Sequence, residues 1–166
     1  MAYWQLGMAM RRRAEAEQRA SNQEGFRKWM EKTVEQFHQA YQILPHEGAS
    51  YNWLGVAYAE MGDYSRAAEW LHKLVDKEPG NPYAKLQLGG VFQQGRFYDS
   101  AEYYYQQALM QDPSMAESYG RLYQLFFEQK RYDRAATVLE DWLRRNPGDP
   151  VDRKSTRLNS SHRIRS

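Results

Sequence analysis

The protein has 166 residues, of which 27% are charged and 14% are aromatic, and it contains no cysteine. The lack of cysteine excludes disulfide bonds, thiolate zinc sites and a cysteine nucleophile. No apolar run reaches the roughly 18 residues of a membrane-spanning helix, so no membrane span is predicted. No signal peptide is recognised, and a cytoplasmic location is therefore the default expectation.

The net charge of +2 arises in residues 152–166, which hold five basic residues and one acidic residue. The remaining residues hold 18 basic and 20 acidic side chains, so binding to nucleic acid is not expected. Residues 152–162 resemble one translated frame of a sequencing adapter. We therefore predict that residues 150–166 form a disordered, artefactual tail and that the natural sequence is cut near Val151.

Residues 1–47 are predicted to form one antiparallel pair of helices. The segment from Ser21 to Gly25 is the turn-like cluster of this region. Each helix is expected to be about seven residues, or nearly two turns, longer than the helices that follow. The pair would then protrude by roughly 10 Å beyond its neighbours, at about 1.5 Å per residue. It is interpreted either as an extended cap for this end of the protein or as a contact arm.

Residues 48–149 contain three copies of a pattern with a period of 34 residues, which is typical of helical-hairpin repeats. The predicted repeats are residues 48–81, 82–115 and 116–149, and we number the positions of each repeat from its first residue. Positions 4, 7, 8 and 11 form one stripe of the first helix. Proline at position 32 ends the second helix, because it lacks an N–H group and its ring clashes with the preceding turn. Residues 1–47 match the pattern at Gly7 (position 8) and Phe37 (position 24).

This pattern resembles the tetratricopeptide repeat family. The resemblance rests on leucine and glycine at positions 7 and 8, an aromatic residue at position 11, alanine at position 20 and proline at position 32. It implies an all-α fold, a right-handed α-solenoid of antiparallel helix hairpins. The third repeat departs from the pattern, because Tyr123 stands where a small residue is expected and Lys130 stands where the turn glycine is expected. In the second repeat, Gly95 comes one place early.

No catalytic, cofactor or metal site is predicted. His38, His46 and His72 are not spaced three or four residues apart, so no two of them share one turn of a helix as a helical metal site requires. The pair Gly89-Gly90 lies within a predicted helix and is not followed by the Gly-Lys-Ser/Thr of a phosphate-binding loop. The chain is therefore not expected to be an enzyme or to hold a cofactor.

The family resemblance further implies that the first helix of each repeat lines a concave groove that binds a protein or peptide partner. Side-chain amides there can hydrogen-bond a peptide backbone, and aromatic side chains can anchor an apolar residue. The leading expectation is a protein-interaction scaffold. The residues predicted to face the groove are Asn52, Val56, Glu60, Tyr83, Leu86, Gln93, Gln94, Gln124 and Phe127.

Two other functions are kept as alternatives. The repeats could be the non-catalytic arm of a larger, truncated enzyme, for example a transferase. They could also be a self-assembly element, because the third repeat has no capping helix after it and would expose Trp142 and Leu143. For the same reason the third repeat is expected to fray first.

Overall fold

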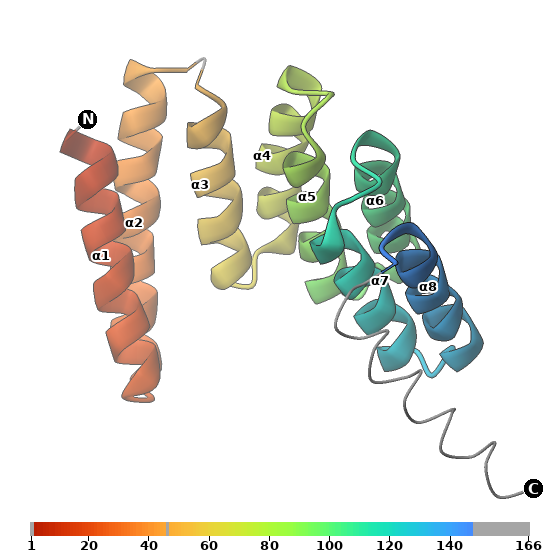
Figure 1. The fold of residues 1–166 in the computed structure, drawn as a ribbon. Helices are drawn as coiled ribbons and strands as arrows, with labels where there is room; N and C mark the ends of the chain where they lie inside the picture. The colour runs from red at the N-terminus through yellow and green to blue at the C-terminus, as the bar shows by residue number, and fades with distance from the viewer. Residues whose placement is uncertain (1, 46, 148–166) are drawn as a thin grey trace, which may run out of the picture.

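The computed structural model describes residues 2–45 and 47–147 (Figure 1). The predicted tail at residues 150–166 lies outside the described residues, as does His46. Within the described ranges the protein is an all-α, right-handed solenoid of antiparallel helix hairpins, as predicted. Its helices are α1 (Ala2–Arg19), α2 (Gln23–Ile43), α3 (Gly48–Glu60), α4 (Tyr64–Lys77), α5 (Pro82–Gln94), α6 (Tyr98–Gln111), α7 (Ala116–Glu128) and α8 (Tyr132–Arg145).

The helices form two rows. Each helix packs on the next one in the chain, and α5 also contacts both α3 and α7. Within the described residues the backbones of α4 and α6, and those of α6 and α8, do not approach as closely, and these helices meet through their side chains. We call the side formed by α3, α5 and α7 the first-helix face, and the side formed by α4, α6 and α8 the second-helix face.

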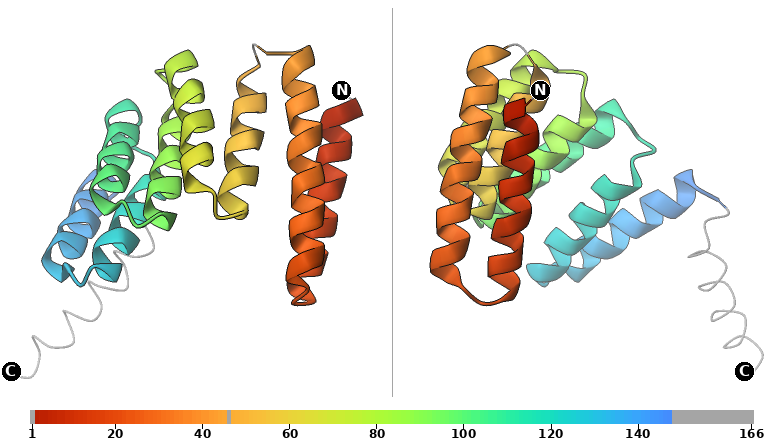
Figure 2. Two further views of the ribbon diagram at one scale, coloured as in Figure 1. Left: turned by 180° about the vertical axis from the view of Figure 1, so that it is seen from behind. Right: turned by 90° about the vertical axis from the view of Figure 1, so that its left-hand side faces the viewer.

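The α1–α2 hairpin is longer than the hairpins that follow. Its helices have 18 and 21 residues, whereas the later first and second helices have 13 and 14. The hairpin extends past the turn between α3 and α4 (Figure 2). Asn22 begins α2, because its side-chain oxygen accepts a hydrogen bond from the backbone N–H of Gly25 at 3.0 Å.

The turn inside each repeat has the same backbone conformation whatever its residue. Gly62, Arg96 and Lys130 all stand at position 15 and all have positive φ angles, of 78°, 64° and 59°. Gly95, the glycine that stands one place before the expected turn position, has φ −74° and ends α5. The backbone conformation is therefore set by the repeat, because two non-glycine residues accept the left-handed region that usually favours glycine.

The core of each hairpin depends on a close approach between positions 8 and 24. A Cβ atom added to Gly7, Gly55 or Gly89 would lie 2.5–2.7 Å from the side chain of the position-24 residue, which is Phe37, Leu71 or Tyr105. These three side chains are at most 1% exposed. In the third repeat Tyr123 occupies position 8, and Leu139 at position 24 is 38% exposed. The third hairpin, which has Tyr123 in place of glycine, is therefore less closely packed at this point than the other three.

The expectation that Trp142 and Leu143 are exposed is wrong, because both are half-buried. The ring of Trp142 packs on the ring of Tyr119, with centroids 5.2 Å apart. The large apolar side chains exposed at this end are instead Phe127, Tyr132 and Leu139.

Candidate functional site

Two hollows lie on the first-helix face: the larger one between α3, α5 and the end of α4, and the smaller one between α3, α5 and α7. One has a volume of about 250 Å³ and is lined by residues that include Asn52 of α3 and Tyr83 of α5. The other has a volume of about 140 Å³ and is lined by residues that include Val56 and Gln94. Gln87 lines both hollows, so they adjoin along α5.

The local sequence explains how α5 is placed between these hollows. Pro82 occupies the first turn of α5, where its missing N–H group costs no hydrogen bond. Asn81 caps the helix, since its side-chain oxygen accepts hydrogen bonds from the backbone N–H groups of Tyr83 and Ala84 at 2.9 and 3.3 Å. The Lys85 ammonium donates to the carbonyl oxygen of Pro79 at 2.5 Å, which ties the helix to the loop before it.

Six of the nine residues predicted for the groove line these hollows. Asn52 and Tyr83 line the larger one, and Val56, Glu60, Leu86 and Gln94 line the smaller one. Leu86 was predicted to face the groove, but it is only 3% exposed and belongs to the hydrophobic core. Its side chain can therefore offer little surface to a partner. Tyr83, in contrast, is 59% exposed.

Glu60 is engaged by the long hairpin. The guanidinium of Arg11 on α1 donates hydrogen bonds to both carboxylate oxygens, from Nε at 3.1 and 2.9 Å and also from a terminal nitrogen. This hydrogen bonding raises the pKa of Arg11. Glu60 is therefore already neutralised within the protein, and α1 supplies a charge at the border of the smaller hollow.

The other three predicted residues lie outside the two hollows. The Tyr105 hydroxyl donates to the side-chain oxygen of Gln93 at 2.7 Å, and the Gln93 amide donates to Glu128 at 2.9 Å. Gln124 also donates to Glu128, at 2.8 Å. Burial raises the pKa of Tyr105 to about 12, so its hydroxyl stays protonated as the donor of this chain.

Phe127 is half-exposed and lies against its own hairpin. Its ring contacts those of Tyr123 and Tyr132, with centroids 5.9 and 5.4 Å apart. Phe127 therefore belongs to the exposed end of the third repeat and does not line either hollow.

Gln87 and Arg121 also line the hollows, although neither was predicted to do so. Both stand at position 6, and Arg121 lines the smaller hollow, where it pairs with Glu117 at 3.4 Å. The spacing in the sequence could have identified them, because position 6 lies one helical turn from positions 2 and 9 and so shares their side of the helix.

The polar groups of the two hollows are mostly uncharged or already paired. The side chains of Asn52, Gln87 and Gln94 form no hydrogen bond with any other residue in the described ranges. An amide side chain offers both donors and an acceptor. The hollows can therefore hydrogen-bond a ligand that carries both kinds of group, while they offer little net charge.

Within residues 2–45 and 47–147, no group of three or more histidine, aspartate or glutamate side chains could hold a metal ion. No helix in these ranges combines the length and the apolar character needed to span a membrane.

Antiparallel helix hairpins stacked in register, with hollows along their first helices, define a helical-repeat solenoid protein. The family model described as tetratricopeptide repeat matches residues 31–88 and 92–152. The chain therefore belongs to the tetratricopeptide repeat family.

Solved structures with the same fold include MamA and YrrB. The match to a crystal structure of MamA has 18% sequence identity and a TM-score of 0.61, and it covers 82% of this chain and 75% of the MamA chain. YrrB, described as a TPR protein with an unusual peptide-binding site, is 15% identical with a TM-score of 0.62; the match covers 79% of this chain and 68% of YrrB. At these identities the likeness shows the fold alone. None of the curated proteins compared matches this sequence.

Proposed function

We propose that this protein is an interaction scaffold whose first-helix face forms a concave groove for an extended segment of a partner protein. The observation that carries the proposal is the pair of adjoining hollows along α3 and α5, with Gln87 in both. Three side-chain amides there, of Asn52, Gln87 and Gln94, have no hydrogen-bond partner among the described residues.

The chemistry of these groups favours a peptide backbone as the ligand. A peptide in extended form presents N–H and C=O groups along its length, and each amide side chain can pair with both kinds. The exposed ring of Tyr83 supplies an apolar surface for one side chain of the peptide. YrrB, which shares the fold, is itself described as having a peptide-binding site.

The charge distribution favours an uncharged recognition motif. Glu60 is paired with Arg11, and Glu117 with Arg121, so two of the three acids that line the hollows have a cationic partner. The third, Glu78, accepts a hydrogen bond from the Asn81 side chain at 2.7 Å. We therefore expect binding that depends weakly on salt, because few charges are left to be screened.

The test begins with selection of random linear peptides, displayed on phage, against the purified protein. The dissociation constant of each enriched peptide is then measured by calorimetry. Gln87→Ala should weaken binding about tenfold, which corresponds to roughly 1.4 kcal/mol and thus to one or two hydrogen bonds. The matched control is Gln42→Ala, an exposed glutamine on α2 away from both hollows. Equal affinity for Gln87→Ala and the unaltered protein, or no enrichment above a control protein, would overturn the proposal.

Self-association is a second candidate, favoured by the exposed apolar side chains at the α7–α8 end. Phe127, Tyr132 and Leu139 are 51%, 56% and 38% exposed. Light scattering at rising protein concentration tests this candidate, with Leu139→Lys as the variant that should abolish any oligomer. A strict monomer would remove it. The remaining alternative, a non-catalytic arm of a larger enzyme, rests on the family resemblance alone and would use the same groove.

A further inference from the structure

The second-helix face carries a feature that repeats along the solenoid. Between α2 and α4, the ring of His38 meets the rings of Tyr58 and Trp70 edge to face, with centroids 6.1 and 5.4 Å apart. Between α4 and α6, His72 meets Phe92 and Tyr104 in the same way, at 6.0 and 5.7 Å. In both places position 25 of one repeat packs on positions 11 and 23 of the next. Aromatic rings thus fill both junctions.

The third junction, between α6 and α8, lacks two of the three rings. Phe126 keeps position 11, but position 25 holds Gln106 and position 23 holds Val138. An open hollow of about 410 Å³ lies at this place, and all three of these residues line it. Apolar walls are completed by Leu109 and Leu122. The hollow therefore coincides with the site where the other junctions hold a histidine ring and a large aromatic ring.

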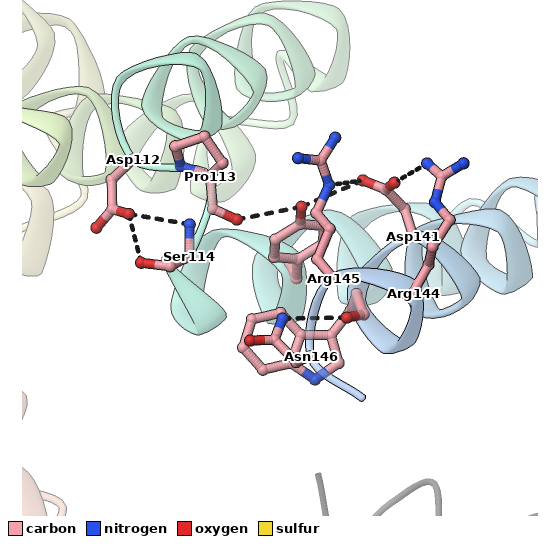
Figure 3. A network of polar contacts seen from close by, with 9 residues as sticks. Asp112, Pro113, Ser114, Asp141, Arg144, Arg145 and Asn146 are labelled. Carbon is pink, nitrogen blue, oxygen red and sulfur yellow. Dashed lines mark hydrogen bonds and ion pairs between the residues drawn. The ribbon is translucent and has the colours of Figure 1, made fainter. Parts of the chain in front are cut away.

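The rim of this hollow has more positive than negative charges. Glu102 pairs with two arginines, Arg131 at 3.7 Å and Arg134, whose Nη1 donates to it at 2.9 Å. At the other end, Asp141 pairs with Arg144 and with Arg145, whose Nε lies 3.0 Å from its carboxylate (Figure 3). These hydrogen bonds from Arg144 and Arg145 lower the pKa of Asp141, so it stays ionised. Of these charged groups, Arg134, Arg144 and Asp141 line the hollow itself, so its lining has one positive charge in excess.

We propose that this hollow is a second binding site, for a linear segment of a partner protein that carries an aromatic side chain beside carboxylates. The aromatic ring takes the place of the missing rings, against Phe126, Val138 and Leu109. The carboxylates lie at the rim, beside Arg134 and Arg144, which outnumber Asp141 among the residues that line the hollow. This site is on the second-helix face, so it does not depend on the proposed groove between α3, α5 and α7.

Three observations favour an aromatic, acidic segment as the ligand of this site. The neighbouring junctions show that this fold places aromatic rings edge to face at the site, and such pairs are favoured by the charge distribution of the ring. The guanidinium of Arg134 lies 4.2 Å from the centre of the Phe126 ring, so charged and aromatic groups already adjoin there. The unbalanced positive charge selects an acidic segment over a basic one.

The binding test uses three short peptides, each acetylated and amidated. The first has the sequence glutamate–tryptophan–glutamate, the second replaces both glutamates by lysine, and the third replaces tryptophan by alanine. Titrations are followed by the methyl resonances of Leu109, Leu122 and Val138. The first peptide should shift these resonances, and the other two should bind at least about tenfold more weakly. An unchanged spectrum with the first peptide, or equal binding of the lysine peptide, would refute the proposal.

Variants that fill the hollow with a ring of the protein itself test the position of the peptide. Val138→Trp restores the large ring of position 23, and Gln106→His restores the histidine of position 25. Circular dichroism and thermal melting establish that each variant is folded, and either one suffices for the test. Both should weaken binding of the acidic tryptophan peptide at least about tenfold, whereas Asn52→Ala on the opposite face should not change it. Retained binding in the folded filled variants would place the peptide elsewhere and overturn the proposal.

A second copy of the protein is the competing occupant. Sedimentation of the unaltered protein and of Val138→Trp at rising concentration distinguishes the two. A monomer in both cases agrees with a peptide partner. A dimer that Val138→Trp abolishes would assign the hollow to another copy of this chain, and the proposal of a separate partner would be wrong.

Discussion

Glycine at position 8 sets the distance between the two helices of a hairpin. A Cβ atom on Gly89 would lie 2.7 Å from the ring of Tyr105 and 3.3 Å from the backbone oxygen of Ala101. The next residue, Gly90, has only the Tyr105 hydroxyl oxygen near such an atom, at 3.8 Å. Two adjacent glycines of one helix thus differ in whether a methyl group fits.

This difference gives a matched pair of substitutions. Gly90→Ala should raise the free energy of unfolding by up to about 1 kcal/mol, because alanine favours helix over glycine. Gly89→Ala gains the same helix propensity but should still lower stability, by about 1–3 kcal/mol, because the buried ring has no room to move. Urea unfolding followed by circular dichroism measures both values. A Gly89→Ala protein as stable as Gly90→Ala would contradict the close approach.

His38 links the stability of the first junction to pH. Its Nε2 lies 2.9 Å from the Tyr58 hydroxyl, and its ring packs on Trp70. Burial, together with the positive charges of Arg66 and Lys73, lowers its pKa below the ordinary 6.5. As the pH falls below 6.5, the unfolded chain binds a proton that the folded protein still rejects, so folding becomes less favourable until the folded-state pKa is passed.

We expect His38→Phe to lose less stability than the unaltered protein when the pH is lowered from 7.5 to 5.5. Phenylalanine keeps a ring against Trp70 but has no proton to bind. Urea unfolding at both pH values gives the comparison, and the carboxylates contribute equally to each protein. The same loss of stability in both proteins would show that His38 does not carry this pH dependence.

At the scale of the elements, α1 is coupled to α3 at two places. The rings of Trp4 and Trp53 lie 5.3 Å apart near one end of the pair, and Arg11 holds Glu60 at the other. The Arg11 side chain is 27% exposed and the Glu60 side chain 30%, so water still screens the pair. Such pairs contribute modestly to stability.

A double-mutant cycle with Arg11→Ala and Glu60→Ala should give a coupling free energy of about 0.5–1 kcal/mol at low salt. The coupling should fall as salt is added, because the ions screen a partly exposed pair. Arg12→Ala is the control, since Arg12 is exposed on the same helix and forms no ion pair with any residue in the described ranges. A coupling of zero at low salt would mean that the pair does not hold the long hairpin against α3.

For the molecule as a whole, stability should decrease toward the α7–α8 end. Each residue of a solenoid contacts only its own repeat and the neighbouring ones, so a helix with one neighbour buries less surface. Helix α4 buries Ala67, Leu71 and Leu74, whereas α8 buries only Ala135 among its described residues. Local opening is easiest where few apolar contacts are buried.

We therefore expect the backbone amides of α8 to exchange with deuterium faster than those of α4. Exchange followed by NMR or mass spectrometry at neutral pH gives the protection of each helix, and α6, which has hairpins on both sides, is the internal control. Protection of α8 equal to that of α4 would contradict this gradient in stability.

The sequence predicted the helical hairpins because its apolar and small residues recur with the period of the repeat, and local spacing determines which face of a helix is buried. It did not predict that Arg96 rather than Gly95 takes the left-handed turn, because the closing of the whole hairpin fixes that conformation. Local preference is a weaker constraint than the packing of both helices.

The candidate sites were less predictable, because they depend on residues from different repeats. Asn52, Val56, Gln94 and Tyr83, which the family resemblance assigned to a groove, line the two hollows of the first-helix face. Only the tertiary structure pairs Glu60 with Arg11, 49 positions away, directs Gln93 and Gln124 to Glu128, and opens a hollow between Gln106 and Val138. The sequence by itself determined the repeat and its core, since these follow from local periodicity. The fold decided which polar groups stay free to bind, because that depends on partners brought together from distant parts of the chain.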